Sequence, residues 1–271
     1  MKYVGKCLML ISFVILMFGP MAFAETITIK GSTTVLPIAQ ACAEEFMNQH
    51  SSVDISVQGG GSGVGIASVV DGTADIGDAS RTIKDKELDA AVASGRDPKA
   101  HVIAMDGIAV IVNASNNLKA LTKKQLKDIY TGKISDWSQL GAGNGKIIVN
   151  SRDSASGTFE AFIGLALDGA KVRPDALLAA SNKAVLMAVS NTPGAIGYVG
   201  LGYVDSKVKV ISIDGVIPTK ETVLSGEYSL SRPLFMYTNG DPKGAVKDFI
   251  DFVLSKDGQS IAEDNGYVGL K

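Results

Sequence analysis

The sequence has 271 residues, of which 46% are hydrophobic and 20% charged, and its formal net charge is −2. A chain of this size forms one large domain or two domains of ordinary size. Its mildly acidic balance, with no basic run, argues against nucleic acid as a partner.

The first 24 residues have the pattern of a secretory signal. Lys2 and Lys6 give a charged start, residues 7–21 are almost wholly apolar, and residues 22–24 read Ala-Phe-Ala, an A-x-A cleavage site. A membrane anchor is the alternative, but the apolar run is short for a spanning helix and ends at the processing site. We therefore expect residues 1–24 to be a cleaved signal and the mature chain to begin at Glu25.

Removal of the signal would leave Cys42 as a single cysteine. One thiol makes no internal disulfide, so the fold must be stabilised by its core. Cys42 falls on the apolar face of a helical pattern with Leu36, Ala39 and Phe46. We interpret it as a small buried hydrophobe rather than a nucleophile.

Short β-branched runs alternate with amphipathic helical runs in the first part of the mature chain. Strands are predicted at 26–30, 53–58 and 74–77, and helices at 35–48, 63–71 and 85–94. This alternation is typical of an α/β fold with largely parallel strands.

The longest apolar strand is predicted at 101–113, and polar, turn-like residues follow it at 115–117. An amphipathic helix at 121–130 begins after Thr122, a good N-cap residue. Later strands are predicted at 146–150, 195–199, 208–213 and 234–237, and helices at 158–167, 183–189 and within 244–262.

Three junctions between a predicted strand and a helix share a turn of small and hydroxyl residues. They are Gly31-Ser32-Thr33-Thr34, Gly59-Gly60-Gly61-Ser62-Gly63 and Ser156-Gly157-Thr158. Each places hydroxyls beside the free N–H groups of a helix N-terminus, where the helix dipole favours an anion. Arg152, just before the third corner, adds a planar set of donors that suits a tetrahedral oxyanion.

Ordinary helix capping is the alternative explanation at each corner, because Ser and Thr are common N-caps and glycine runs are common turns. A fourth segment, Asp78-Ala79-Ser80-Arg81, ends a strand with a carboxylate, a hydroxyl and a cation. Three hydroxyl-bearing corners together with Arg81 and Arg152 favour an anion site over capping alone.

Catalytic and nucleotide-binding motifs fit the sequence poorly. Val64 breaks both G-x-S-x-G around Ser62 and G-x-G-x-x-G in the triple-glycine loop. His50 and His101 are the only histidines, which leaves little material for a His-based triad or a His-rich metal site. We therefore predict no catalytic residue, no metal and no cofactor.

In their order and spacing these segments resemble the periplasmic phosphate-binding proteins of bacterial ABC phosphate importers. The resemblance extends over nearly the whole mature chain and includes residues 74–81, 106–110, 121–137 and 194–198. It implies a two-lobe α/β fold of type II strand order, with a ligand cleft at the hinge. Residues 25–112 would form the first lobe, residues 113–208 the second, and residues 209–271 a return segment that completes the first.

The resemblance also implies a set of phosphate ligands. From the first lobe these are Thr33, Thr34, Ser62, Gly63 and Ser80, and from the second lobe Arg152, Ser156, Gly157 and Thr158. We add Arg81 and Asp106 to the predicted phosphate-binding residues from their positions in the sequence. The chain departs from some family members at Arg81, where those members have an Asp that accepts the proton of hydrogen phosphate.

A proton acceptor matters because phosphate carries a proton near neutral pH whereas sulfate carries none, so a buried carboxylate favours the first. Asp106 and Asp78 are the available substitutes. We favour Asp106, because the hinge strand should pass beside the cleft.

The expected function is therefore capture of inorganic phosphate in the periplasm by a monomer that delivers it to a membrane permease. Because Arg81 stands where some family members have the proton-accepting Asp, sulfate, molybdate or arsenate is an alternative main ligand. A secreted phosphohydrolase with Ser62 or Thr33 as nucleophile is another alternative, although it lacks an evident base and metal cluster. A module that senses phosphate without transport is a third.

Overall fold

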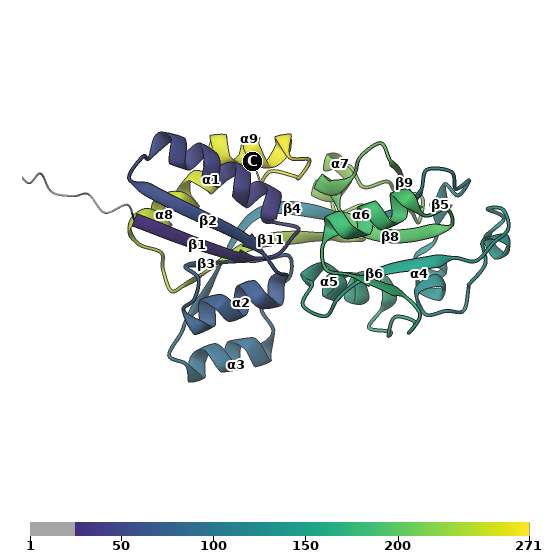
Figure 1. Ribbon diagram of the computed structural model, residues 1–271, viewed down its shortest axis with the longest axis horizontal. Helices are drawn as coiled ribbons and strands as arrows, with labels where there is room; N and C mark the ends of the chain where they lie inside the picture. Colours follow the sequence, from purple (N-terminus) through teal and green to yellow (C-terminus); the bar gives the residue numbers. More distant parts are fainter. Residues whose placement is uncertain (1–24, 271) are drawn as a thin grey trace, which may run out of the picture.

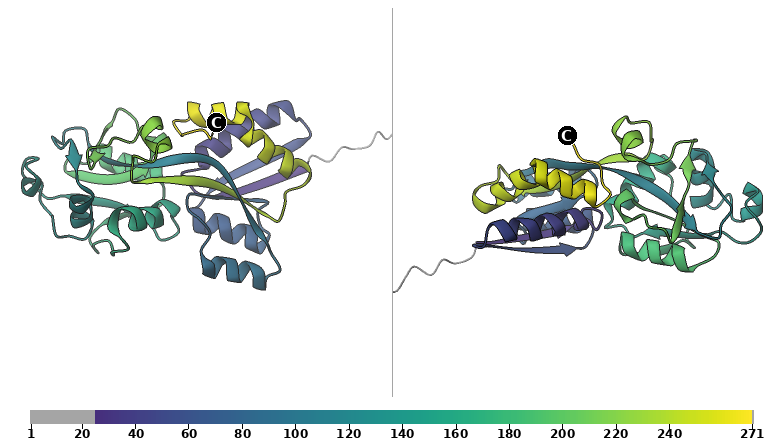
Figure 2. Two further views of the ribbon diagram at one scale, coloured as in Figure 1. Left: turned by 180° about the vertical axis from the view of Figure 1, so that it is seen from behind. Right: turned by 90° about the horizontal axis from the view of Figure 1, so that it is seen from above.

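The computed structural model describes residues 25–270, and the predicted secretory signal lies outside these described residues. Two lobes lie side by side, and two long antiparallel strands, β4 (Pro98–Asn113) and β11 (Ser231–Asn239), run between them (Figure 1). The view from behind shows these two strands along most of their length (Figure 2, left). Within the described residues, no helix is long and apolar enough to cross a membrane.

The first lobe combines the start and the end of the chain. Its other elements are β1 (Glu25–Gly31), α1 (Leu36–Gln49), β2 (Val53–Gly59), α2 (Ser62–Asp71), β3 (Ile76–Ala79), α3 (Asp85–Ala93), α8 (Gly244–Leu254) and α9 (Lys256–Asp264). The strand order is β2-β1-β3-β11-β4, with β1, β2 and β3 parallel and β11 antiparallel to β3. Helices α1, α8 and α9 cover one face of this sheet, and α2 and α3 cover the other (Figures 1 and 2).

The second lobe is built from the middle of the chain. Its elements are β5 (Ala120–Leu121), α4 (Lys123–Tyr130), a 3₁₀ helix (Trp137–Leu140), β6 (Ile148–Arg152), α5 (Gly157–Leu167), β7 (Leu177–Ala179), α6 (Asn182–Asn191), β8 (Ala195–Gly200), a second 3₁₀ helix (Leu201–Tyr203), β9 (Val208–Val210), β10 (Ser212–Ile213) and α7 (Lys220–Leu224). The sheet continues from β4 through β8 and β6 to β7, with β9 also paired to β4.

The far half of β4 shows why this lobe has helices on both faces. Ile108, Val110 and Val112 pack in the cluster formed with α4 and α5, whereas Ala109 and Ile111 pack in the cluster formed with α6. Successive side chains of a strand point to opposite faces, so an uninterrupted apolar run is the pattern of a strand covered on both sides.

Strand pairing and core packing indicate where one lobe ends and the other begins. β9 and β10 pair with strands of the second lobe, and Ile211, Tyr228 and Leu230 pack in its core, so the segment 209–230 lies in the second lobe. Leu234, in β11, packs in the core of the first lobe. On this packing we propose lobe boundaries near residues 107 and 231 instead of 113 and 208, because β4 is long enough to pair within both lobes.

Most predicted elements occur in the structure with ends shifted by a few residues, but the run 208–213 is divided into β9 and β10, and β5, β7 and α7 were not predicted. Thr122 is the N-cap of α4 as expected, and its hydroxyl accepts a hydrogen bond from the backbone N–H of Gln125 at 3.1 Å. Cys42 is fully buried, and burial raises the pKa of its thiol to about 12. This agrees with its interpretation as a small hydrophobe.

Helix α2 lies close against β1 and β3 because glycines line the contact. A Cβ added at Gly65 would lie 2.6 Å from the carbonyl oxygen of Asp78 and 2.7 Å from that of Lys30. A Cβ at Gly77 would lie 2.5 Å from the carbonyl oxygen of Gly65. This close approach fixes the start of α2, and Ser62 with it, against the ends of the two strands.

Replacement of Gly65 by alanine should therefore destabilise the protein. The backbones of α2 and β3 must separate to admit the methyl group, and we expect a loss of about 1–3 kcal/mol in the free energy of unfolding. Gly164→Ala on the exposed face of α5 is the matched control, because a Cβ there meets nothing within 4 Å and alanine favours a helix. Urea unfolding of both variants measures the difference, and equal stabilities would contradict the argument.

Candidate functional site

Four helices begin at the junction of the two lobes, α1 and α2 from the first lobe and α5 and α6 from the second (Figure 1). The hydroxyls of Thr34 and Thr158 lie 2.8 Å apart, and the backbone N–H of Gly63 donates to the carbonyl of Ala155 at 3.1 Å. The structure therefore brings together corners that are far apart in sequence, 124 residues in the case of Thr34 and Thr158. We call the buried hydroxyl residues at this junction the hydroxyl cluster, and they are Thr33, Thr34, Ser62, Ser80, Ser156 and Thr158.

Local capping explains only part of the three predicted corners, in one of which the Ser32 hydroxyl accepts from the N–H of Thr34 at 3.2 Å. Ser156 is the N-cap of α5, and its hydroxyl accepts from the N–H of Phe159 at 3.2 Å. Helices α1 and α2 have no side-chain cap. The Thr34 hydroxyl instead meets that of Thr158, and the Ser62 hydroxyl accepts from the backbone N–H of Ser80 at 2.9 Å. The capping alternative thus accounts for Ser156 and not for Thr34 or Ser62.

Glycines allow the corners of the two lobes to approach each other. Gly61 has a φ of +98°, and a Cβ there would lie 2.5 Å from the carbonyl oxygen of Ala155. A Cβ at Gly157 would lie 2.1 Å from the Ser62 hydroxyl. Side chains at these positions would keep the lobes apart, which explains glycine at both.

Arg152 is buried at the end of β6, beside the third corner. Its Nε donates to the carbonyl of Ala179 at 2.9 Å and its Nη2 to that of Ala180 at 3.0 Å. Burial lowers the pKa of Arg152, and the nearby Arg232 lowers it further, although an arginine remains charged in proteins. These hydrogen-bond partners are neutral, so the positive charge of Arg152 is available to attract an anion.

Arg232, at the start of β11, is a member of the site that sequence reasoning missed. Its Nη2 and Nε donate to Oδ2 of Asp106 at 2.8 and 3.1 Å, and both side chains are buried. The same Nη2 donates to the Thr158 hydroxyl at 3.0 Å, and Nη1 donates to the carbonyl of Ser80 at 3.0 Å. Arg232 therefore joins the hinge strands to hydroxyl corners of both lobes.

Asp106 lies where β4 passes the hydroxyl cluster, and both of its carboxylate oxygens accept hydrogen bonds. Oδ1 accepts from the backbone N–H of Leu201 at 2.9 Å, and Oδ2 accepts from Arg232. Burial raises the pKa of Asp106, while Arg232 and the Leu201 N–H oppose that rise only in part. The carboxyl therefore has a higher proton affinity than an exposed Asp.

Asn182, the first residue of α6, is a second member that sequence reasoning missed. Its side-chain nitrogen donates to the hydroxyls of Thr33 and Thr34 at 3.2 and 3.0 Å, and its oxygen accepts from the N–H of Gly200 at 3.1 Å. The Tyr203 hydroxyl also donates to the carbonyl of Thr33 at 2.6 Å. These contacts fix the first corner against the second lobe.

Ser80 and Arg81 are neighbours in sequence but face different surroundings. The Ser80 hydroxyl lies 3.3 Å from that of Ser62 within the cluster. The guanidinium of Arg81 instead lies against Glu87, with Nη2 2.7 Å from Oε1, and against Glu160 of α5. Its charge is thus close to the cluster but paired with carboxylates.

Comparisons with known proteins identify the family of this chain. Residues 22–257 match the family model described as the PBP superfamily domain. The chain is 39% identical over 248 residues to the phosphate-binding protein PstS of Bacillus subtilis, which covers 90% of this chain and 80% of that protein. The PstS protein of Borreliella burgdorferi is 31% identical, with 91% of each chain covered.

This chain belongs to the PstS family of the PBP superfamily.

Solved structures support the same fold. A Clostridium perfringens structure with bound phosphate, named for a phosphate ABC transporter substrate-binding protein, is 36% identical and has a TM-score of 0.86, covering 91% of this chain and all of that one. An ABC-type phosphate transport receptor from Vibrio cholerae is 33% identical with a TM-score of 0.74, covering 89% and 99%. The predicted two-lobe fold of type II is confirmed for this PstS family member.

Asp78, the other acceptor considered from sequence, lies outside the hydroxyl cluster. Gly77 faces α2, so the next side chain of β3 points to the α1 side of the sheet, where the Asp78 charge also raises the pKa of Cys42. Its Oδ1 is buried without a hydrogen-bond partner among the described residues. Burial raises the pKa of Asp78 well above its usual value, so the carboxyl favours the protonated form.

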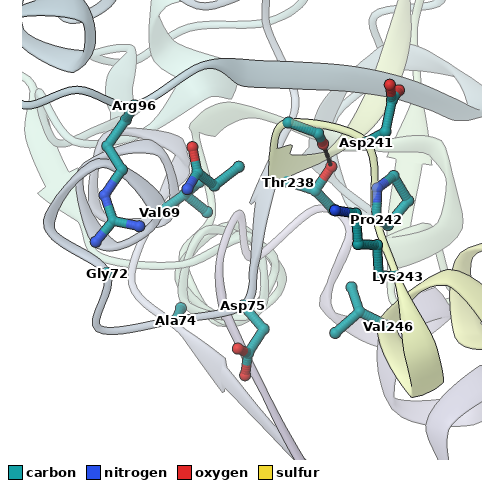
Figure 3. A pocket seen from close by; sticks show the side chains of 12 residues that line it. Val69, Gly72, Ala74, Asp75, Arg96, Thr238, Asp241, Pro242, Lys243 and Val246 are labelled. Atoms are coloured by element: carbon teal, nitrogen blue, oxygen red, sulfur yellow. Dashed lines mark hydrogen bonds between the residues drawn. The ribbon is translucent and has the colours of Figure 1, made fainter.

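A pocket of about 550 Å³ lies elsewhere, at the end of the first lobe far from the junction (Figure 3). Arg96 and Lys243 lie on opposite sides of it, and Asp75 and Asp241 also line it. This pocket mixes charges of both signs and contains none of the predicted site residues. Among residues 25–270, no group of three or more His, Cys, Asp or Glu side chains is placed to hold a metal ion.

Replacement of Asp78 by asparagine should change how stability depends on pH. Because the folded protein holds the Asp78 proton more tightly than the unfolded chain, the contribution of Asp78 is full below about pH 4 and is lost as pH rises toward the folded pKa. We therefore expect the free energy of unfolding of the wild type to fall, relative to that of Asp78→Asn, between pH 4 and pH 8. Urea unfolding across this range measures the difference. Parallel pH curves for the two proteins would contradict a neutral, buried Asp78.

Proposed function

We propose that this protein captures inorganic phosphate between its lobes and delivers it to an ABC importer. The observation that carries the proposal is the convergence of buried hydroxyls, backbone amides and two buried arginines at four helix N-termini from both lobes. Relatives named phosphate-binding protein, and a related structure with bound phosphate, support the same ligand.

The proposed ligands are groups that donate hydrogen bonds from fixed positions. They are Thr33, Thr34, Ser62, Gly63, Ser80, Arg152, Ser156, Gly157 and Thr158, as the sequence predicts, together with Arg232. Donors preorganised in a site sheltered from water bind an anion without the cost of ordering them on binding. The Arg81 guanidinium, which lies near Gly63, belongs to the proposed site through its charge.

We propose that Asp106 accepts a hydrogen bond from the proton of hydrogen phosphate. Its raised pKa makes it a good proton acceptor, and it lies beside Arg232 at the centre of the cluster. Sulfate carries no proton to donate. A sulfate oxygen and the Asp106 carboxylate would therefore repel each other, because both present lone pairs.

We also propose that the protein performs no bond chemistry, is processed to a periplasmic form and works as a monomer. The Ser62 hydroxyl contacts the N–H and the hydroxyl of Ser80, and neither group is a general base. A binding role therefore fits this serine better than the nucleophile considered from sequence.

Calorimetric titration of the protein, stripped of bound anion, tests the ligand. We expect tight one-to-one binding of phosphate that excess sulfate does not displace. Arg152→Ala removes a buried charge and should weaken phosphate binding roughly a hundredfold or more. Arg96→Ala, in the distant pocket of Figure 3, is the control and should leave affinity unchanged. If Arg152→Ala bound phosphate as the wild type does, the proposed site would be abandoned.

Asp106→Asn tests the proton acceptor. The variant keeps the shape of the side chain but loses the acceptor charge, so we expect the preference for phosphate over sulfate to fall by about tenfold or more. Asp78→Asn is the matched control, since its carboxyl lies outside the cluster, and it should keep the wild-type preference. Competition titrations of both variants decide between the two carboxyls, and a loss of preference in Asp78→Asn alone would reverse the assignment.

A further inference from the structure

Four charged side chains meet across the lobe junction, beside the anion site. Arg81, Lys84 and Glu87 come from the first lobe, and Glu160 comes from α5 of the second. Arg81 contacts Oε1 of Glu87 at 2.7 Å and Oε2 at 2.8 Å, and it also forms an ion pair with Glu160. Lys84 forms a second ion pair with Glu160.

Each half of this network is adjacent in sequence to a hydroxyl of the proposed site. Arg81 follows Ser80, and Glu160 lies two residues after Thr158 in the first turn of α5. The network and the hydroxyl cluster therefore move with the same two segments. Any opening that separates Ser80 from Thr158 also pulls Arg81 and Lys84 away from Glu160.

The charges of the network balance only while the lobes are together. Arg81 and Glu87 lie in the same lobe, so they stay paired when the lobes separate, whereas Glu160 loses both of its cations. The side chains of Arg81, Glu87 and Glu160 are 9%, 19% and 20% exposed. Such burial reduces screening by water and salt, so the pairs made by Arg81 are stronger than pairs on an open surface. The Lys84 side chain is 38% exposed, so its pair with Glu160 is weaker.

The pKa directions agree with strong pairing. Burial by itself would lower the pKa of Arg81, but its hydrogen bond to Glu87 and the charges of Glu160 and Glu87 raise it overall. Burial would likewise raise the pKa of Glu87, and the bonds from Arg81 and from the N–H of Lys84 lower it overall. The contacts between Arg81 and Glu87 therefore favour the charged forms of both side chains.

We propose that Glu160 is a positioning residue that holds the two lobes closed by pairing with Arg81 and Lys84, and that it thereby sets the rate at which the bound anion leaves. The contacts of Glu160 with Arg81 and Lys84 are observed in the structure, whereas their effect on anion release rests on the proposed function. Among the described residues, the Glu160 side chain contacts cations of the other lobe and no group of the hydroxyl cluster.

A second ion pair between the lobes provides a matched control. Lys220 of α7 contacts Glu263 of α9 at 2.6 Å, but these side chains are 46% and 34% exposed. A pair of this exposure is worth little because water and salt screen it. Removal of either glutamate deletes the same charge from the lobe junction, but Glu160 is more buried and pairs with two cations where Glu263 pairs with one.

Stopped-flow measurement of phosphate release from Glu160→Gln tests the proposal in the full protein, purified from the periplasm. We expect phosphate release about tenfold faster than from the wild type, with the association rate little changed. This change lies between the effect of losing an exposed ion pair and that of losing a buried one. Glu263→Gln should change release by less than about twofold. Raising the salt concentration should speed release from the wild type more than from Glu160→Gln. Equal release rates for wild type and Glu160→Gln, or equal effects of both substitutions, would overturn the proposal.

A second measurement needs no phosphate and keeps the two proposals separable. Spin labels at Ala93→Cys on α3 and Asn117→Cys in the second lobe report the distance between the lobes by pulsed electron resonance. Both positions are exposed, whereas Cys42 is buried with a raised pKa and escapes labelling.

In protein stripped of anion, we expect Glu160→Gln to shift the label distances toward longer values, and Glu263→Gln to leave them as in the wild type. If the wild type failed to bind phosphate while Glu160→Gln still lengthened the distances, the ligand proposal would fail and the closing role would stand. A lower melting temperature for Glu160→Gln with unchanged distances would show a structural role only and would overturn the proposal.

Discussion

The buried pair of Asp106 and Arg232 is the interaction on which the rest of the structure depends. It joins β4 to β11 where both strands pass between the lobes, and removal of water from two charges is tolerated only because each has several partners. Loss of one partner of such a pair typically costs about 3–5 kcal/mol, so the pair fixes the register of the two strands. Nη2 of Arg232 donates to the Thr158 hydroxyl as well as to Asp106, and Nη1 donates to the carbonyl of Ser80. The hydroxyl corners of both lobes are thereby placed relative to the hinge.

The parts of the candidate site that could be predicted from the sequence are those with a local signal. A hydroxyl beside glycine at the end of a strand is visible within a few residues, and so is the amphipathic pattern that follows it. Arg232 and Asn182 lack such a signal, since one is an arginine between Ser231 and Pro233 and the other follows an ordinary N-cap. A charged side chain at the start of a buried apolar strand must have a partner of opposite charge or a hydrogen-bond partner. For Arg232, this requirement is the signal in the sequence that could have indicated its role. The lobe boundary that we propose near residue 107 has no local signal either, because β4 continues through it without any break in its apolar pattern.

Neighbouring residues in this chain serve different purposes at the lobe junction. Ser80 and Thr158 turn their hydroxyls into the cluster, whereas Arg81 and Glu160 meet outside it. One pair of segments thus carries both the groups that would touch an anion and the charges that join the lobes. The rigid contact of α2 with β1 and β3, through Gly65 and Gly77, allows little adjustment between these two sets. Movement of the lobes is therefore expected to act on both sets at once.

The way the chain threads through the lobes also bears on the order in which they can fold. Residues of the second lobe form one continuous stretch, but the sheet of the first lobe needs β11, which pairs with β3 across more than 150 residues. Closing so long a loop is slow, and contacts between distant segments form late. Asp106 and Arg232 are brought together only by that final pairing. A chain threaded unfolded across a membrane would therefore have no anion site until its last strand had emerged, and the site would first exist on the far side.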